Sequence, residues 1–197
     1  MIKVVGVLGT LNSGKNTFAN VFASSGKFTP MAFADPIKVI LQDLFHLTTA
    51  ELWGGSNERT PHARELMQTF GTDFARKYDP DIWVKKMEER IHFCEHYGRD
   101  LCFPHGWGPQ TKEGVVITDL RFPNEAQMLR EKYHAVIVKI VRPHSGDDAK
   151  LEHTQHASET AVADITRELI NRVVFNTGTK EDLLAEATRL LGEICSQ

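Results

Sequence analysis

Cysteine is scarce in this chain, and long apolar runs and an excess of basic residues are missing. The 197 residues include three cysteines, at positions 94, 102 and 195, and no Cys-x-x-Cys pair. Such a count excludes a disulfide framework and is typical of reduced thiols, so we expect a cytoplasmic protein. No apolar stretch approaches the roughly 20 residues that a membrane span needs, and the apolar segment that starts right after Met1 leaves no room for a secretion signal. We therefore expect no membrane partner.

The charge balance is slightly acidic, with a net charge of −3. That sign argues against a protein that grips duplex DNA or an anionic membrane, so nucleic acid is not an expected partner. Hydrophobic residues make up 41% and charged residues 25% of the chain, as in ordinary globular proteins. The length fits a single domain with a full core, covering residues 1–197.

A phosphate-binding loop is the strongest motif present. The segment Gly9–Thr17 has the frame Gly-x-x-x-x-Gly-Lys and follows the apolar run Val4–Leu8. Its glycines let backbone N–H groups turn toward phosphates, Lys15 supplies a positive charge, and a hydroxyl reaches Mg²⁺. The hydroxyl comes one position late, at Thr17. The residues predicted to bind ATP here are Leu11, Asn12, Ser13, Gly14, Lys15, Asn16 and Thr17.

Apolar strand-like segments alternate with amphipathic helical ones along the chain, which predicts an α/β fold with a parallel sheet of about five strands and helices on both faces. The predicted strands are Val4–Leu8, Met31–Phe33, Val115–Thr118, Val136–Val141 and Arg172–Phe175. The predicted helices are Lys15–Ala23, Pro36–Phe45, Pro61–Tyr78, Pro80–His96, Pro123–Lys132 and Lys180–Ile194. In such a fold, ligands bind at the carboxyl ends of the strands.

Charged residues follow the predicted strand Val115–Thr118. Asp119 resembles the Walker B carboxylate that holds Mg²⁺ through water, and Arg121 would face the same crevice and neutralise phosphoryl oxygens. Together with Thr17, Asp119 forms the predicted metal site. The alternative is a surface Asp–Arg pair in a turn.

Two later strands also end in polar residues. Arg142 follows Val136–Val141 and could contact phosphate or adenine; a surface arginine at a strand exit is the alternative. Asn176 and Gly178 follow the last strand, where a loop of this fold lies near the purine, although Asn-Thr-Gly is also an ordinary turn before a helix.

Candidates for binding a second substrate lie in, or directly before, the helices predicted over about residues 36–96. Asp35 and Lys38 follow the second predicted strand. Arg64 and Gln68 are four apart and share one helix face, which could bind an anion and read a base. An ordinary polar helix face is the alternative.

Two segments are predicted as loops. Residues 97–114 are interpreted as a solvated insertion, and residues 143–158 as part of a lid over about 143–170. His153 and His156, with His144 nearby, lack the acidic or cysteine partners of a structural zinc site, so we interpret them as surface or lid histidines.

Several motifs together resemble the phage-type deoxynucleoside monophosphate kinases. They run from the first strand to the last helix and comprise the phosphate-binding loop, Phe33–Lys38, Arg64–Asp73 with Trp83-Val84, Thr118–Glu125, Val141–Pro143 and His156–Glu159. The resemblance implies a P-loop kinase that uses ATP and Mg²⁺ to phosphorylate a deoxynucleoside 5′-monophosphate. Lys15, Arg121, Asp119 and Arg142 would be catalytic, while Asp35, Lys38, Arg64, Gln68 and Arg121 would bind the acceptor. Asn16 departs from the family, which commonly has Asp there.

Other functions remain open at this point. Thr179–Asp182 spells a guanine-recognition motif, but the Asp-x-x-Gly switch element of GTPases is missing. A kinase for another acceptor, such as phosphomevalonate or a modified base in DNA, and a non-catalytic nucleotide-binding module are further alternatives. The sequence also leaves open whether the chain forms a homodimer.

Overall fold

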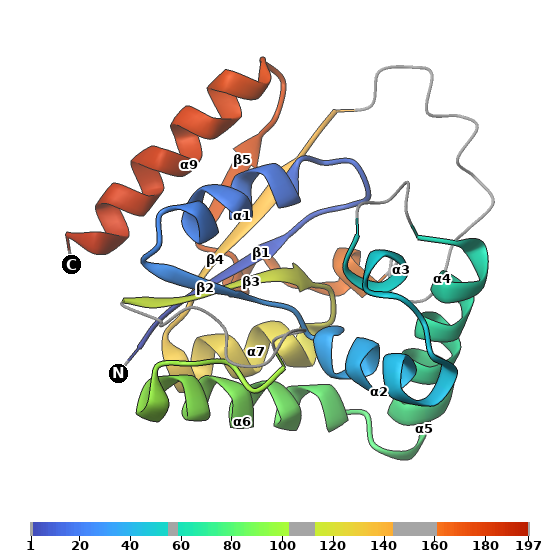
Figure 1. Ribbon diagram of the computed structural model, residues 1–197. Helices are drawn as coiled ribbons and strands as arrows, with labels where there is room; N and C mark the ends of the chain where they lie inside the picture. Colours follow the sequence, from blue (N-terminus) through green and yellow to red (C-terminus); the bar gives the residue numbers. More distant parts are fainter. Residues whose placement is uncertain (1, 55–58, 103–112, 144–160, 197) are drawn as a thin grey trace. The chain divides into compact units, whose positions relative to one another are not determined.

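The computed structural model describes residues 2–54, 59–102, 113–143 and 161–196. These residues divide into two compact units, Met1–Ala32 with Gln110–Gln197 and Phe33–Pro109. The first unit holds a sheet of five parallel strands in the order β2-β3-β1-β4-β5 (Figure 1). The strands are β1 (Lys3–Leu8), β2 (Phe28–Met31), β3 (Gly114–Leu120), β4 (Val136–Val141) and β5 (Arg172–Phe175).

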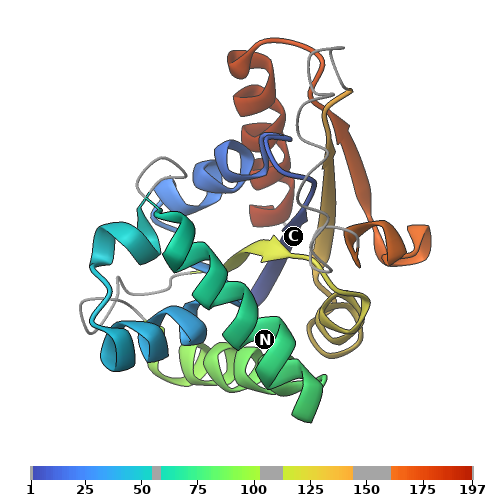
Figure 2. The same cartoon turned by 90° about the vertical axis from the view of Figure 1, so that its right-hand side faces the viewer.

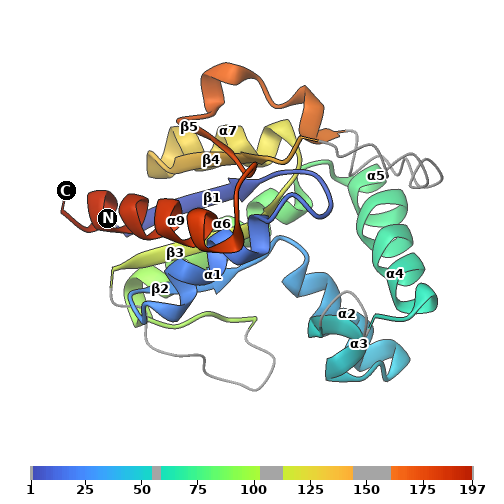
Figure 3. The same cartoon turned by 90° about the horizontal axis from the view of Figure 1, so that it is seen from above.

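Helices cover both faces of the sheet, as the alternation predicts. Val5 and Val7 of the central strand pack in one apolar cluster with residues of α1 (Lys15–Ser24) and α9 (Lys180–Cys195). Gly6, between them, faces Leu129 of α7 (Pro123–Tyr133). Since successive strand residues point to opposite faces, α1 and α9 lie on one face and α7 on the other; Figures 2 and 3 show this layering.

The predicted bounds hold at β4 and β5 but fail at β2. The segment Met31–Phe33 was predicted, whereas β2 runs over Phe28–Met31 and contains Pro30. Because β2 pairs only with β3, it is an edge strand, where a proline without an N–H is tolerated. The predicted bounds of this strand were therefore wrong.

The second unit is helical. Its elements are α2 (Asp35–Phe45), α3 (Thr49–Trp53), α4 (Pro61–Gln68), the π-helical segment η1 (Thr69–Ala75), α5 (Arg76–Tyr78) and α6 (Ile82–Tyr97). Thr60 caps α4 through its side chain, as expected before a proline at the first helical position. The predicted helix Pro61–Tyr78 is continuous but changes to π-helical pairing at η1. There the indole Nε1 of Trp83 donates to the Gly71 carbonyl at 2.8 Å, which ties α6 to η1.

The predicted lid falls mostly outside the described residues, since only its ends, 143 and 161–170, are covered. The covered part holds two short 3₁₀ turns, η3 (Ala161–Asp164) and η4 (Arg167–Leu169), which pack near α7. Most of the predicted loop 97–114, the histidines 144, 153 and 156, and Lys150, which the resemblance places in the lid, also lie outside the described residues. No described helix has the length and apolar character needed to cross a membrane.

Candidate active site

The phosphate-binding loop connects β1 to α1. α1 begins at Lys15, directly after Gly14, whose φ of +97° is a conformation that side-chain-bearing residues rarely adopt. A Cβ on Gly14 would also lie 2.7 Å from Nδ2 of Asn176. At Gly9 a Cβ would lie 2.5 Å from Oγ of Ser13 and 2.7 Å from the Ile140 carbonyl. The two glycines of the motif are thus required by the backbone and by its close neighbours.

Ser13 is buried inside the loop. Its side chain is 1% exposed, and its Oγ has no hydrogen-bond partner among the described residues. Its backbone is fixed on both sides: the N–H donates to the Thr10 carbonyl at 3.3 Å, and the carbonyl accepts from Nδ2 of Asn176 at 2.9 Å. A buried hydroxyl without a partner among the described residues, in a loop of this frame, fits a phosphate cradle.

The lysine of the motif contacts its own loop. Nζ of Lys15 donates to the Thr10 carbonyl at 3.1 Å, across the turn that a phosphate would fill. A phosphate oxygen is a charged acceptor and competes well with this neutral carbonyl. Asn16, in the next position, is exposed on the first turn of α1.

A cavity of about 240 Å³ lies beside the loop. It brings together five residues that the sequence predicted, coming from the loop and from the ends of β4 and β5: Gly14, Thr17, Arg142, Asn176 and Gly178. Leu183 and Lys180 of α9 complete the lining. Lys180 was noted in the sequence as part of the guanine-recognition motif Thr179–Asp182, but it was not predicted to line this cavity.

Asp119 lies one residue before the end of β3, not after the strand as predicted. The register between β1 and β3 shifts here: Gly6 pairs with Ile117 and Leu8 with Leu120. One residue of β1 therefore opposes both Thr118 and Asp119. Such a bulge re-aims side chains at a strand end. The following residue is the buried Leu120, in place of the glutamate that many P-loop ATPases use to activate water.

Arg121 is held through its backbone by Glu125. This glutamate is 1% exposed, and its Oε2 accepts the N–H groups of Arg121 at 2.9 Å and of Phe122 at 3.0 Å. A carboxylate in the first turn of α7 also interacts favourably with the positive, N-terminal end of the helix dipole. Glu125 belongs to the motif Thr118–Glu125, but its role was not predicted; its place as the third residue of a predicted helix was the available signal.

Asp35 and Lys38 lie together in the second unit, within a group of buried charges. Lys38 is 7% exposed; its Nζ lies 3.1 Å from Oδ1 of Asp35 and 5.7 Å from the ring centre of Trp53. Arg90, fully buried, contacts Oδ2 of Asp35 at 2.9 Å and both carboxylate oxygens of Asp100 at 2.9 and 2.6 Å. A side chain before a proline at the start of a helix often caps the helix, but Asp35 does not cap α2, because its carboxylate binds these two cations.

The positive charge of Arg90 is secured by its surroundings. Burial alone would lower the pKa of its guanidinium, but the hydrogen bond with Asp100 and the charges of Asp35 and Asp100 outweigh burial and raise that pKa. Arg90 is therefore always charged. Its role was not predicted, since 55 residues separate it from Asp35 and no sequence pattern links the two.

Arg64 and Gln68 are both exposed on α4, one turn apart, while Ala63 faces the interior. The shared face that their spacing predicts is therefore present. Acceptor binding by this face is not tested by the geometry and stays a prediction.

The segment Thr179–Asp182 is a helix cap. Oδ2 of Asp182 accepts the Thr179 N–H at 2.8 Å, and the Thr179 hydroxyl accepts the Asp182 N–H at 3.2 Å. The N–H and the hydroxyl of Thr179 both donate to Oδ2 of Asp182, and these two bonds lower the pKa of its carboxyl. The aspartate that would read guanine in a GTPase is thus used to start α9.

Comparison with known proteins agrees with this geometry. The sequence model of the family "Deoxynucleotide monophosphate kinase" matches residues 54–186. A protein of Acanthamoeba polyphaga mimivirus, named "Putative deoxynucleotide monophosphate kinase", is 30% identical over 196 residues, which cover 93% of each chain. The "Deoxynucleoside-5'-monophosphate kinase" of Escherichia phage T5 is 28% identical over 114 residues, 55% of this chain and 39% of that protein.

Solved structures support the fold. Dephospho-CoA kinase from Campylobacter jejuni superposes with a TM-score of 0.52 at 16% identity over 98% of both chains. A sugar kinase from Janibacter sp. HTCC2649 gives a TM-score of 0.51 at 15% identity over 98% of this chain and 95% of that one. The parallel sheet with its phosphate-binding loop is therefore the P-loop kinase fold. With the family match over residues 54–186 and a full-length relative at 30% identity, this chain belongs to the deoxynucleotide monophosphate kinase family.

Proposed function

We propose that this kinase transfers the γ-phosphoryl group of ATP to the phosphate of a deoxynucleoside 5′-monophosphate, giving ADP and the deoxynucleoside diphosphate. One observation carries the proposal beyond the family match. The cavity beside the phosphate-binding loop is lined by Gly14 and Thr17 together with Arg142 and Asn176, as a site for a nucleoside triphosphate requires.

Residues of the phosphate-binding loop and their neighbours hold ATP. The loop amides and Lys15 bind the β- and γ-phosphates, with Lys15 exchanging the Thr10 carbonyl for a phosphate oxygen. Asn176 braces the loop through the Ser13 carbonyl. Thr17 and Asp119 offer hydroxyl and carboxylate oxygens, the donors that Mg²⁺ prefers, so they fit a magnesium ion held partly through water. When bound, Mg²⁺ neutralises charge on the transferred phosphoryl group.

The transfer itself needs positioning and charge neutralisation. An oxygen of the acceptor phosphate forms the new bond to the γ-phosphorus while the bond to the bridging oxygen of ADP breaks, in line with it. The acceptor phosphate is already ionised at neutral pH, so no general base is required. Arg121, held by Glu125, and Arg142 stabilise the equatorial oxygens. We assign the acceptor side to Arg64, Gln68 and Lys38, with Asp35 orienting the ammonium of Lys38.

An ADP-release assay with ATP, Mg²⁺ and a panel of acceptors tests the proposal. The panel holds the four dNMPs, modified dNMPs, the corresponding NMPs and phosphomevalonate. We expect ADP release that depends on a deoxynucleoside monophosphate. Release with phosphomevalonate alone, or steady release without any acceptor, would refute the proposed substrate.

Two substitutions test the assigned roles. Lys15→Ala and Arg121→Ala should each lower kcat by about 10²–10³-fold, the usual cost of removing a donor to developing charge. Arg189→Ala is the matched control, because Arg189 is an exposed arginine on α9 paired with Glu186 and Glu193. Near-native turnover in Lys15→Ala or Arg121→Ala would remove that residue from the mechanism.

A further inference from the structure

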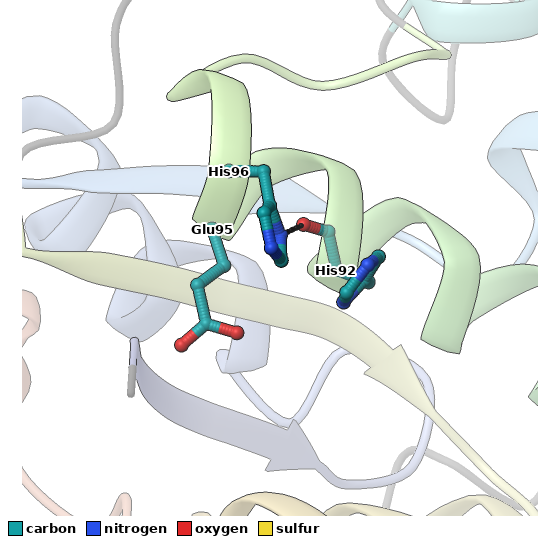
Figure 4. A group of neighbouring side chains, drawn as sticks. All are labelled: His92, Glu95 and His96. Atoms are coloured by element: carbon teal, nitrogen blue, oxygen red, sulfur yellow. Dashed lines mark hydrogen bonds between the residues drawn. The ribbon is translucent and has the colours of Figure 1, made fainter.

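Three potential metal ligands meet on the exposed side of α6. His92, Glu95 and His96 are all exposed and follow the spacing i, i+3, i+4, so they share one face of the last helical turns. Their ligand atoms all lie within 4.8 Å of one another. Figure 4 shows the two imidazole rings and the carboxylate projecting from the same side of the helix.

The helix backbone sets the state of one imidazole. Nδ1 of His96 lies 2.9 Å from the carbonyl oxygen of His92, shown as a dashed line in Figure 4. A carbonyl oxygen can only accept, so Nδ1 carries the hydrogen and the lone pair of the neutral ring is on Nε2. Metal-bound histidines are commonly fixed in this way, with the second ring nitrogen donating to a backbone carbonyl.

The two rings are close enough for one ion. Their centroids are 4.1 Å apart and their planes meet at 51°, so the rings are tilted and not stacked flat. Two histidines four residues apart on a helix are the spacing that zinc proteins use in His-Glu-x-x-His sites. The carboxylate of Glu95 adds an oxygen ligand and a negative charge that offsets that of the ion.

We propose that His92, Glu95 and His96 form a surface site for a divalent transition-metal ion of the Zn²⁺ type, with water as the fourth ligand. Two imidazole nitrogens and one carboxylate oxygen suit Zn²⁺, Co²⁺ or Ni²⁺, whereas Mg²⁺ prefers an all-oxygen set. The site is therefore distinct in chemistry from the magnesium site proposed for Thr17 and Asp119. Cys94 lies between the ligands in sequence but is buried, which leaves three protein ligands.

Bound metal would act on the stability of α6. An ion that binds only the folded chain shifts the unfolding equilibrium toward the folded state and raises Tm as its concentration increases. Because the ligands span one turn near the end of α6, unfolding of that turn separates them. The proposal does not depend on kinase activity, so its failure would leave the proposed function untouched.

Calorimetric titration with ZnCl₂ in the presence of excess Mg²⁺ measures the affinity and the number of bound ions. CoCl₂ as a second probe gives a visible absorption band when the ion is bound by nitrogen ligands. We expect one equivalent to bind and to raise Tm. His92→Ala and His96→Ala should each weaken binding by about tenfold or more, since even changes beyond the direct ligands cost about 10–100-fold. His62→Ala, which removes an exposed histidine of α4, is the control and should bind as the native chain does.

The double variant His92→Ala/His96→Ala gives the decisive result. Its kinase activity should equal that of the native chain, which also shows that it folds, while the equivalent of bound zinc is lost. If that variant still binds one equivalent with native affinity, the ion sits elsewhere, for example at His153 and His156, and the proposal is wrong. The absence of any binding to the native chain would overturn it equally.

Discussion

Replacing Arg90 by methionine removes one positive charge from a group of ion pairs that has little contact with solvent. The Arg90 side chain is fully buried, Asp100 is 2% exposed and Asp35 is 13% exposed. The guanidinium donates to both oxygens of Asp100 and to one oxygen of Asp35 at 2.6–2.9 Å. Without it, two carboxylates remain, and Asp100 has almost no access to water.

The expected loss follows from this burial. Removing one partner of a buried ion pair costs about 3–5 kcal/mol, because the remaining charge stays desolvated and uncompensated. Methionine keeps much of the apolar volume of arginine, so the change measures lost charge compensation more than a cavity. A loss of this size is a large share of the roughly 5–15 kcal/mol by which domains are stable.

Urea unfolding followed by circular dichroism gives the free energy of unfolding of each variant. Arg90→Lys keeps the charge but loses the two-pronged contact with Asp100, so its loss should be smaller than that of Arg90→Met. The double variant Arg90→Met/Asp100→Asn should recover part of the loss of Arg90→Met, since it removes the stranded carboxylate. Arg189→Met, at an exposed pair, is the control and should change stability little.

The refuting outcomes are specific. A loss below about 1 kcal/mol in Arg90→Met would mean that the group is solvated or dispensable, contrary to the burial argument. A double variant that is no more stable than Arg90→Met would show that the carboxylate of Asp100 is not the source of the cost.

Three further predictions concern Gly14, Glu125 and Asp182. Gly14→Ala should lower the free energy of unfolding by about 1–3 kcal/mol and weaken ATP binding, because alanine is strained at φ +97° and its Cβ would meet Asn176. Gly192→Ala in α9 is the control: its Cβ would meet open space, so it should stabilise the chain. Unfolding curves and ATP titration compare the two variants. Glu125→Ala should lower the free energy of unfolding by about 1–3 kcal/mol and lower kcat, because two backbone N–H groups lose their acceptor. Glu125→Gln keeps an acceptor oxygen and should restore much of the stability and of kcat. Unchanged kcat in Glu125→Ala would refute the positioning role. The pKa of Asp182 is lowered in the folded chain, so its contribution to stability is present above the ordinary value of 3.8 and is lost as the pH falls through the folded value. Asp182→Asn should therefore flatten the dependence of Tm on pH below about pH 4. An equal fall of Tm with pH in the native chain and in Asp182→Asn would contradict this.

The parts of the fold that sequence could predict are those with local signals. β4 and β5 have the predicted bounds, and α1 starts at the predicted residue, because an apolar run or a phosphate-binding loop is visible within ten residues. β2 was misplaced by three residues, since a proline excludes a strand only where its missing N–H matters, and that depends on the neighbours of the strand in the sheet. The π-helical segment η1 had no signal that periodicity can detect.

The same division holds in the site. Gly14, Thr17, Arg142, Asn176 and Gly178 could be grouped from sequence, because parallel strands end at one edge of the sheet and gather whatever follows them. Which atoms those side chains use could not be predicted. The loop of Asn176 was expected to lie near the purine, and that stays a prediction; the structure adds that its amide donates to the Ser13 carbonyl and supports the phosphate-binding loop.

Side chains with binding chemistry serve either a ligand or the chain itself, and the hydrogen-bond partners separate the two. Asp182 matches a guanine-binding motif by letter, but its carboxylate caps α9. Glu125 is close to Arg121, which we propose as catalytic, but its carboxylate accepts backbone N–H groups. Thr17 and Arg142, by contrast, line a cavity. Asp35 is the intermediate case. It follows a strand, as a ligand-binding residue would, but its two carboxylate oxygens pair with Lys38 and Arg90. Its influence on the acceptor must therefore pass through the ammonium of Lys38, so Asp35→Asn should change acceptor KM more than ATP KM if Lys38 binds the acceptor.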